Sequence, residues 1–322
     1  MNVRKGILLL CTILCILCKG QTIQAQELPQ YKNYEGFEYS YSSSKDCIWI
    51  MKYKGMEEYV TVPAYIEGKE VRYLCDTFQN NTTIKKVELP DTLVGIGSFT
   101  GCTSLEEITI PKKIKIIPKY SFYGCKNLKQ VQFSEGLIRI EDYSFAECEA
   151  LKEVVIPDTV KSIGKGGFLN CINLEKAVLS KNMEFVYTKV FYNCTKLKTV
   201  ILPKKIHWIT TEAFSGCKSL EKIILPSAVI NIDEYAFQGC GLKEIVLPKK
   251  IEAIREGAFS DCKNLKKVVI KSKKIKKKYL EQLAFTNINK KAVFDVPNSC
   301  IKKYKKWLIE TGSFKKKTMK IK

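Results

Sequence analysis

Eight cysteines recur at a nearly constant interval, and cysteine can form disulfides, bind metals or act as a nucleophile. Each one follows a phenylalanine by three residues, and successive phenylalanines are 23 residues apart for six steps and 22 apart in the last. The eight pairs are Phe99/Cys102, Phe122/Cys125, Phe145/Cys148, Phe168/Cys171, Phe191/Cys194, Phe214/Cys217, Phe237/Cys240 and Phe259/Cys262. The spacing therefore decides which of these chemistries is available.

The spacing argues against a metal centre and against catalysis. No Cys-x-x-Cys occurs after residue 25, and intervals of 23 residues do not fit the usual structural zinc motifs. A nucleophilic cysteine needs a neighbouring base, and nothing in the sequence pairs the single histidine, His207, with a cysteine. We expect no metal site, no cofactor and no enzymatic activity.

Two interpretations of the cysteines stay open. Stacked repeats place equivalent Cα atoms about 5 Å apart, which a disulfide could bridge. Alternatively, each cysteine is a small buried hydrophobe packed beside its phenylalanine, and we favour this second interpretation. Cys47 and Cys75 are the better candidates for a disulfide, because both lie in one terminal segment.

The N-terminus has the features of a secretory signal peptide. Arg4 and Lys5 precede an apolar run over residues 7–18, which is too short to cross a bilayer, and Ala25 follows at a suitable cleavage point. Acylation of Cys18 is the competing interpretation, but Leu17 stands where a lipoprotein signal has a small residue. We expect residues 1–25 to be removed and the mature chain, without a transmembrane segment, to be secreted or held at the cell surface.

The positive charge is concentrated at the C-terminus. The formal net charge is +21, of which residues 1–25 carry +3 and residues 271–322 carry +14, so residues 26–270 carry +4. This distribution argues against a nucleic-acid-binding protein. It suggests contact with an anionic polymer, although a solvated cap with a frayed tail explains the same lysines. The candidate contacts are Lys302, Lys303, Lys305, Lys306, Lys315, Lys316 and Lys317.

Between the Phe-x-x-Cys pairs, each unit has the pattern of one short strand. In the unit from Cys148 to Phe168, the run Leu151–Ile156 is rich in β-branched residues and ends at Pro157, which cannot continue a central ladder. Val160 and Ile163 form a second extended piece. One such unit cannot bury its own apolar side, but stacked units can. The sequence therefore predicts a right-handed solenoid with a parallel sheet.

The units resemble the leucine-rich repeats of BspA-like proteins, the LRR_5 type. The resemblance rests on "IGSFTGC" (residues 96–102), "TEAFSGC" (211–217), "DEYAFQGC" (233–240) and "REGAFSDC" (255–262), and it covers roughly residues 47–310. It implies an α/β-type horseshoe, mostly strand and loop, with about ten 23-residue repeats. The unit "VLSKNMEFVYTKVF" lacks the proline, so we expect an irregular turn there.

The ends are expected to be caps. We divide the chain into a signal peptide (1–25), an N-terminal hairpin and capping repeat (26–77), the repeat array (78–270) and a C-terminal cap with a basic tail (271–322). Alternating aromatic and polar residues predict the hairpin over residues 36–55. After Pro297, Tyr304, Trp307 and Leu308 at helical spacing predict a short helix that stops at Gly312.

The middle residue of each strand should point away from the core, and in six consecutive units it is aliphatic. These residues, here called the ligand stripe, are Val155, Val178, Ile201, Ile224, Val246 and Val269. Strand propensity alone explains such residues, whereas a row of exposed aliphatic side chains would also suit a partner. The charged residues beside the strands have mixed signs, which indicates a solvated surface of lateral pairs.

The expected function is that of a secreted or cell-surface binding module, and the BspA-like resemblance implies adhesion. Its ligand would be an extracellular protein or glycan from a host or microbial surface, bound by a monomer through the solenoid face. The alternative is a non-catalytic scaffold of the cell wall, held to an anionic wall polymer or glycan by the basic C-terminus.

Overall fold

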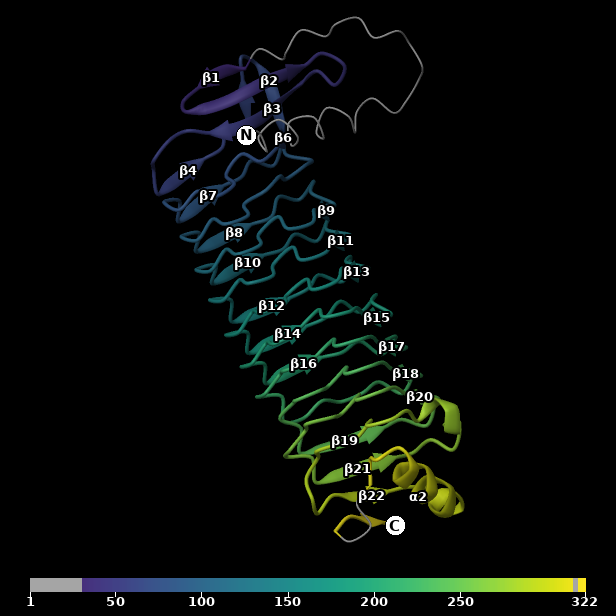
Figure 1. Ribbon diagram of the computed structural model, residues 1–322. Helices are drawn as coiled ribbons and strands as arrows, with labels where there is room; N and C mark the ends of the chain where they lie inside the picture. The colour runs from purple at the N-terminus through teal and green to yellow at the C-terminus, as the bar shows by residue number, and fades with distance from the viewer. Residues whose placement is uncertain (1–30, 315–317) are drawn as a thin grey trace, which may run out of the picture. The chain divides into compact units, whose positions relative to one another are not determined.

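The computed structural model describes residues 31–314 and 318–322 (Figure 1). The expected signal peptide and three of the candidate lysines, Lys315, Lys316 and Lys317, lie outside the described residues. Residues Lys32–Lys322 form one compact unit. Within this unit the chain winds as a stack of about 12 turns, with repeats about 23 residues apart.

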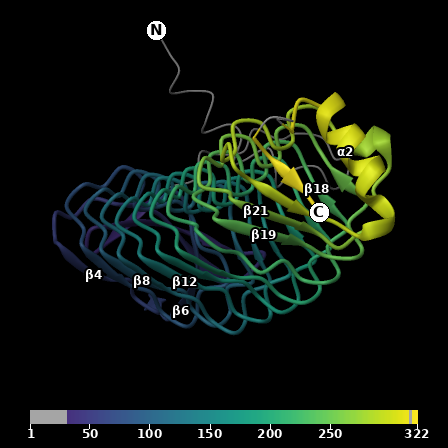
Figure 2. The same cartoon turned by 90° about the horizontal axis from the view of Figure 1, so that it is seen from below.

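A row of short parallel strands, in three hydrogen-bonded groups, runs along the stack and takes one strand from nearly every turn (Figures 1 and 2). Its strands are β4 (Tyr59–Thr61), β7 (Lys86–Glu88), β8 (Glu107–Thr109), β10 (Gln130–Gln132), β12 (Glu153–Val155), β14 (Lys176–Val178), β16 (Thr199–Ile201), β19 (Glu244–Leu247), β21 (Lys267–Ile270), β22 (Val293–Asp295) and β23 (Lys320–Ile321). Within each group the pairing is in register from turn to turn, as in Val154↔Ala177 and Ala177↔Val200. We call this row the first ladder.

A second ladder of two-residue strands lies across the core from the first. It contains β9 (Ile116–Ile117), β11 (Arg139–Ile140), β13 (Ser162–Ile163), β15 (Phe185–Val186), β17 (Trp208–Ile209), β18 (Asn231–Ile232) and β20 (Ala253–Ile254), and every pairing among them is parallel. The prediction of a leucine-rich repeat solenoid, mostly strand and loop, is confirmed. The turns outnumber the eight Phe-x-x-Cys pairs because the four end strands β4, β7, β22 and β23 stack in the first ladder without a Phe-x-x-Cys pair of their own.

The phenylalanines form a continuous column through the core. Neighbouring rings stack with centroids 5.0–5.8 Å apart from Phe78 to Phe285. All eight cysteines of the Phe-x-x-Cys pairs are buried beside this column. Each thiol donates a hydrogen bond to the carbonyl of the phenylalanine in the preceding turn, as Cys125 Sγ does to Phe99 O at 3.1 Å and Cys148 Sγ to Phe122 O at 3.2 Å. The thiols therefore tie each turn to the one before it.

The residue before each of these cysteines has a left-handed backbone, which explains its usual identity. Gly124 and Gly239 have φ of 70° and 65°, and Asn170, Asn193 and Asp261 occupy the same place with φ of 56–59°. Glycine, asparagine and aspartate are the residues that adopt this conformation most readily. The turn geometry, and not a ligand, therefore accounts for the recurring Gly-Cys and Asn-Cys pairs.

The expectation of an irregular turn at "VLSKNMEFVYTKVF" is wrong. Met183 N donates to Ser180 O at 3.2 Å, just as Val160 N donates to Pro157 O at 3.0 Å in the regular turn before it. Ser180 takes the place of the proline, and its buried hydroxyl donates to Val160 O at 2.6 Å. A serine can hold this turn because a side-chain hydrogen bond to the neighbouring turn restrains it.

The N-terminal end is a five-stranded sheet in the order β1-β2-β3-β6-β5. Its strands are β1 (Lys32–Tyr34), β2 (Phe37–Ser42), β3 (Cys47–Tyr53), β5 (Tyr65–Ile66) and β6 (Lys69–Leu74), and the antiparallel pair β2/β3 is the expected hairpin. In the parallel pair β3/β6, Ile48 lies opposite Val71 and Ile50 opposite Leu74. Cys47 and Cys75 thus lie at opposite ends of the pair, about 13 Å apart along the strands, so the suggested disulfide between them is wrong.

The C-terminal end carries α2 (Ile301–Glu310), the single α-helix among the described residues, after the short 3-10 turns η1 (Lys277–Tyr279) and η2 (Asn298–Cys300). Tyr304 and Leu308 face inward from α2, and the Tyr304 hydroxyl donates to Ser272 O at 2.8 Å. Gly312, with φ of 70°, follows the end of the helix. The helix predicted from residues 304–312 is therefore present, and it packs beside the last turns (Figure 2).

Candidate ligand face and basic terminal pocket

The first ladder places the ligand stripe on its outward face. Val155, Val178 and Ile201 lie opposite one another in β12, β14 and β16, while their neighbours Val154 and Ala177 point into the core. Four of the six stripe residues are exposed, with exposed fractions of 75% for Ile224, 55% for Val155, 50% for Ile201 and 36% for Val246. Val178 and Val269 are half-buried. The stripe is thus a row of aliphatic side chains in which Ile224 stands out most.

Lysine–glutamate pairs between successive turns flank the stripe. Their Nζ to Oε distances are 2.5–2.8 Å, and most of their side chains are about half exposed. The pairs are Lys129–Glu106, Lys176–Glu153, Lys198–Glu175, Lys243–Glu221 and Lys267–Glu244. The hydrogen bond from its lysine lowers the pKa of Glu106 and of Glu175. This confirms the expected lateral pairing, and each exposed pair stabilises the fold by at most about 1 kcal/mol.

The first ladder is interrupted at two places, which the sequence did not predict. The strands β10 and β12 are not paired with each other, although each is paired on its other side. This break coincides with Phe133, whose ring packs edge to face on Phe145 with centroids 5.6 Å apart. The second break lies between β16 and β19, where the segment Lys222–Leu225 occupies the strand position without pairing on either side.

A groove opens beside the unpaired segment. It has a volume of about 990 Å³, and we call it the Ile224 groove. Its apolar lining includes Ile224, Leu225, Val246 and Pro248. A smaller groove of about 510 Å³ lies on the other side of the segment, toward β16. Two grooves therefore flank the most exposed residue of the ligand stripe.

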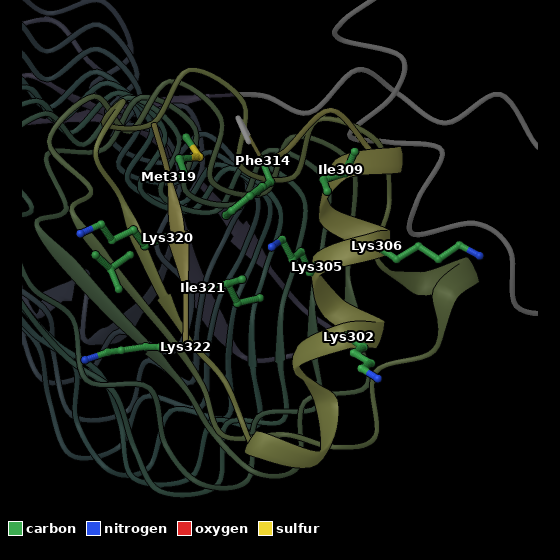
Figure 3. Close-up of a pocket in the computed structure, with 10 residues that line it drawn as sticks. Lys302, Lys305, Lys306, Ile309, Phe314, Met319, Lys320, Ile321 and Lys322 are labelled. Atoms are coloured by element: carbon green, nitrogen blue, oxygen red, sulfur yellow. The ribbon is translucent and has the colours of Figure 1, made fainter. Parts of the chain in front are cut away.

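Three of the candidate lysines, Lys302, Lys305 and Lys306, line a separate pocket of about 970 Å³ between α2 and β23 (Figure 3). Ile309, Phe314, Met319 and Ile321 supply apolar lining, and none of the described residues that line it is acidic. Five lysines are at the pocket, namely Lys302, Lys305, Lys306, Lys320 and Lys322. Lys303 points elsewhere: its Nζ lies 4.8 Å from the centre of the Tyr304 ring and donates to Lys273 O.

The described histidine, cysteine and acidic side chains are not arranged for covalent catalysis or for metal binding. Within residues 31–314 and 318–322, no three His, Cys, Asp or Glu side chains come together as a metal site. Burial raises the pKa of the Cys102 thiol to about 12, and it raises the pKa of Cys148 and Cys240 as well. Thiols in this state are poor nucleophiles at neutral pH. His207 is exposed, on the turn that leads into β17.

The stack, the Phe column and the outward stripe define a leucine-rich repeat solenoid with a solvent-facing parallel ladder. The profile of the family described as "BspA type Leucine rich repeat region (6 copies)" matches residues 75–198 and 186–308. The chain belongs to this BspA-type leucine-rich repeat family. No protein in a search of curated proteins matches the chain.

Solved structures agree on the fold. A leucine-rich repeat protein from Bacteroides ovatus superposes with a TM-score of 0.75 at 23% identity, over 90% of this chain and 76% of that one. The leucine-rich repeat protein of T. pallidum superposes with a TM-score of 0.54 at 28% identity, over 59% of this chain and 91% of that one. No helix among the described residues has the length and apolarity needed to cross a bilayer.

Proposed function

We propose that the chain is a non-catalytic, adhesin-like binding module, secreted or held at the cell surface, that takes an extracellular protein or glycan ligand on the ligand stripe. The observation that carries this proposal is the row of outward-facing aliphatic side chains. Ile224 is the most exposed of them, with 75% of its surface accessible. A row of aliphatic side chains on the solvent-facing side of a sheet suits a partner surface. The signal-like residues 1–25 support the extracellular location.

The size of the stripe is compatible with useful affinity. Complete burial of one exposed aliphatic side chain contributes about 1.5–3 kcal/mol, so Ile201 and Ile224 together could contribute several kcal/mol to an interface. The flanking lysine–glutamate pairs are already neutralised within the chain. They form the polar rim that surrounds the apolar centre of protein interfaces.

The test is a binding screen followed by two substitutions. The mature chain, residues 26–322, is applied to arrays of extracellular-matrix proteins and glycans, and the dissociation constant of each ligand that binds is measured. We expect the double variant Ile201→Thr/Ile224→Thr to weaken binding about tenfold or more. Unchanged affinity for every ligand would refute the role of the stripe.

A second function, a scaffold held to an anionic wall polymer, is supported by the basic pocket in the C-terminal cap. Five lysines from α2 and the β23 segment line it, with no acid among the described lining residues. We expect the variant Lys302→Glu/Lys305→Glu to elute from heparin and from isolated cell wall at lower salt than the wild type. Equal elution would leave the pocket without a role in attachment. Binding of a protein ligand through the stripe would be unaffected in this variant.

A further inference from the structure

Three aromatic side chains lie together on the outward face of the second ladder, across the core from the ligand stripe (Figure 1). Phe185 in β15 lies opposite Trp208 in β17, and the centroids of their rings are 6.4 Å apart. The ring of Tyr187 lies 5.8 Å from that of Phe185. Trp208 is 36% and Tyr187 38% exposed, while Phe185 is half-buried. We call these three residues the aromatic platform.

The packing of the core does not account for these rings. In the same two strands, Val186 and Ile209 are fully buried. Because side chains alternate along a strand, Phe185 and Trp208 point away from the core. The strand β18 has Asn231 opposite Trp208, although its pairing is regular. The outward position therefore does not need an aromatic residue, and exposed rings that the fold does not need suit contact with a ligand.

Polar groups border the aromatic platform. The Asn231 side chain is half-buried and forms no hydrogen bond with another described residue. The Asp233 carboxyl group interacts with the Trp208 side chain. The hydroxyls of Thr188 and Thr210, in the segments that follow β15 and β17, lie 3.3 Å apart. Amide, carboxylate and hydroxyl groups in this arrangement can form hydrogen bonds with the hydroxyls of a ligand.

The charges at the platform favour a neutral ligand with hydroxyls over an anionic one. Glu184, next to Phe185 in the chain, and Asp233 have no cationic partner within ion-pair distance among the described residues. Lys189, which follows β15, is already paired with Glu212 at 3.4 Å. Carboxylates without such partners repel an anionic polymer, whereas they accept hydrogen bonds from neutral hydroxyls.

We propose that the aromatic platform binds a neutral glycan. The C–H groups on one side of a sugar ring form an apolar face, and this face packs on the rings of Trp208 and Tyr187. The hydroxyls at the edge of the sugar ring bind Asn231 and Asp233, which lie beside Trp208. This site shares no residue with the ligand stripe or with the basic pocket, so the proposal goes beyond the function proposed above.

Other aromatic residues at the surface near the second ladder have a structural role. Tyr120 stacks on Tyr143 with ring centroids 5.3 Å apart, and a Cβ atom on Gly166 would come within 2.5 Å of the Tyr143 ring. A Cβ atom on Gly257 would meet the Tyr235 ring at 2.4 Å. These tyrosines therefore cover glycines of the next turn. No described glycine lies under a ring of the aromatic platform in this way, so we assign a ligand to that cluster alone.

The experiment titrates the mature chain by calorimetry with four neutral hexasaccharides, built from β-1,4-linked glucose, xylose, mannose or N-acetylglucosamine. We expect at least one of them to bind with a dissociation constant below about 1 mM. Trp208→Ala should weaken that binding about tenfold or more, because the ring under the sugar is lost. Trp208→Phe keeps a ring and should weaken it less. No binding of any hexasaccharide at about 10 mM would overturn the proposal.

Two control variants test the location of the site. Tyr120→Ala removes another exposed ring, from the turn after β9, and should leave the affinity unchanged. Equal losses in Tyr120→Ala and Trp208→Ala would show non-specific contact, which overturns the proposal. Ile201→Thr/Ile224→Thr should also leave hexasaccharide binding unchanged. If this double variant abolishes binding instead, the glycan lies on the ligand stripe, and this inference fails while the function proposed above stands.

A second substitution keeps the test decisive if Trp208→Ala disturbs the fold. Asn231→Ala leaves every ring in place and should weaken binding about threefold or more, because a hydrogen bond to the sugar is lost. Thermal melting of each variant, followed by circular dichroism, shows whether the solenoid is intact. Unchanged affinity in a folded Trp208→Ala or Asn231→Ala variant would overturn the proposal.

Discussion

The column of buried thiols predicts that the protein loses stability in mild alkali. All eight cysteines of the Phe-x-x-Cys pairs are at most 3% exposed. Burial removes the hydration of the thiolate, and it raises the pKa of Cys102 to about 12 and the pKa of Cys125, Cys194 and Cys262 well above its ordinary value. In the unfolded chain the thiol pKa is about 8.5.

The sign of the effect follows from the protons that each state binds. Above about pH 8.5 the unfolded chain releases its thiol protons while the folded chain keeps them, so the free energy of unfolding falls as the pH rises. At pH 9.5 each thiol lowers it by about 1.4 kcal/mol, and eight thiols together lower it by about 11 kcal/mol. A loss of this size approaches the whole stability of an ordinary domain.

The assay is denaturation with guanidinium at pH 7.0 and at pH 9.5, under reducing conditions, followed by circular dichroism. The upper pH is chosen because ordinary tyrosine and lysine side chains, with pKa values of about 10 and 10.4, contribute little there. Segments of a repeat array can unfold separately, in which case each transition should shift according to the thiols that it contains.

A single substitution provides the control. Cys171→Ser keeps a hydrogen-bond donor for Phe145 O but removes one titrating group. Its stability at pH 7.0 should be somewhat lower, but its loss between the two pH values should be smaller than that of the wild type by about 1.4 kcal/mol. A free energy of unfolding that stays constant from pH 7.0 to 9.5 would refute the reasoning, as would native thiols that react with a disulfide reagent at the unfolded rate.

Three further predictions concern the repeat itself. Phe168→Ala should lower the free energy of unfolding by about 3–5 kcal/mol in denaturant titrations, because the ring is buried between two stacked neighbours. A loss below about 1 kcal/mol would contradict the continuous column of rings. Gly239→Val should lower the free energy of unfolding by about 1–2 kcal/mol, whereas Gly239→Asn should lower it little, because the backbone there is left-handed but the site has room for a side chain. Equal melting temperatures of the two variants would show that the backbone conformation at this site does not limit stability. Lys198→Ala, which removes the exposed pair with Glu175, should change stability by less than about 1 kcal/mol, and a larger loss would reveal a cooperative charge network.

The repeat period alone predicts most of the core. A phenylalanine and a cysteine at a fixed interval must occupy equivalent places in a stack, so the period by itself assigns Phe168 and Cys171 to the interior. The helix around Tyr304 and Leu308 and the hairpin over residues 36–55 follow from side-chain periodicity in the same way. In these segments local pattern and packing agree, and the prediction holds.

The unpaired segment could not be predicted in this way. "KIIL" at residues 222–225 has the same strand propensity as "TVIL" at 199–202 and "EIVL" at 244–247, yet only the last two contain strands of the ladder. Backbone pairing depends on the distance and the relative offset of the neighbouring turns, and a local sequence pattern does not determine either quantity. The one signal in the sequence is the step of 22 residues between Phe237 and Phe259, directly after this segment.

The near-identity of successive turns also sets a problem of register for any long ligand. A partner that recognises Val155, Val178 and Ile201 meets almost the same surface again after a shift of one turn, about 4.8 Å along the stack. Several equivalent alignments of the ligand would then compete, and the complex would be a mixture of binding registers. The unpaired turn at Lys222–Leu225 breaks this translational symmetry. A ligand that contacts this turn can therefore bind in one register only.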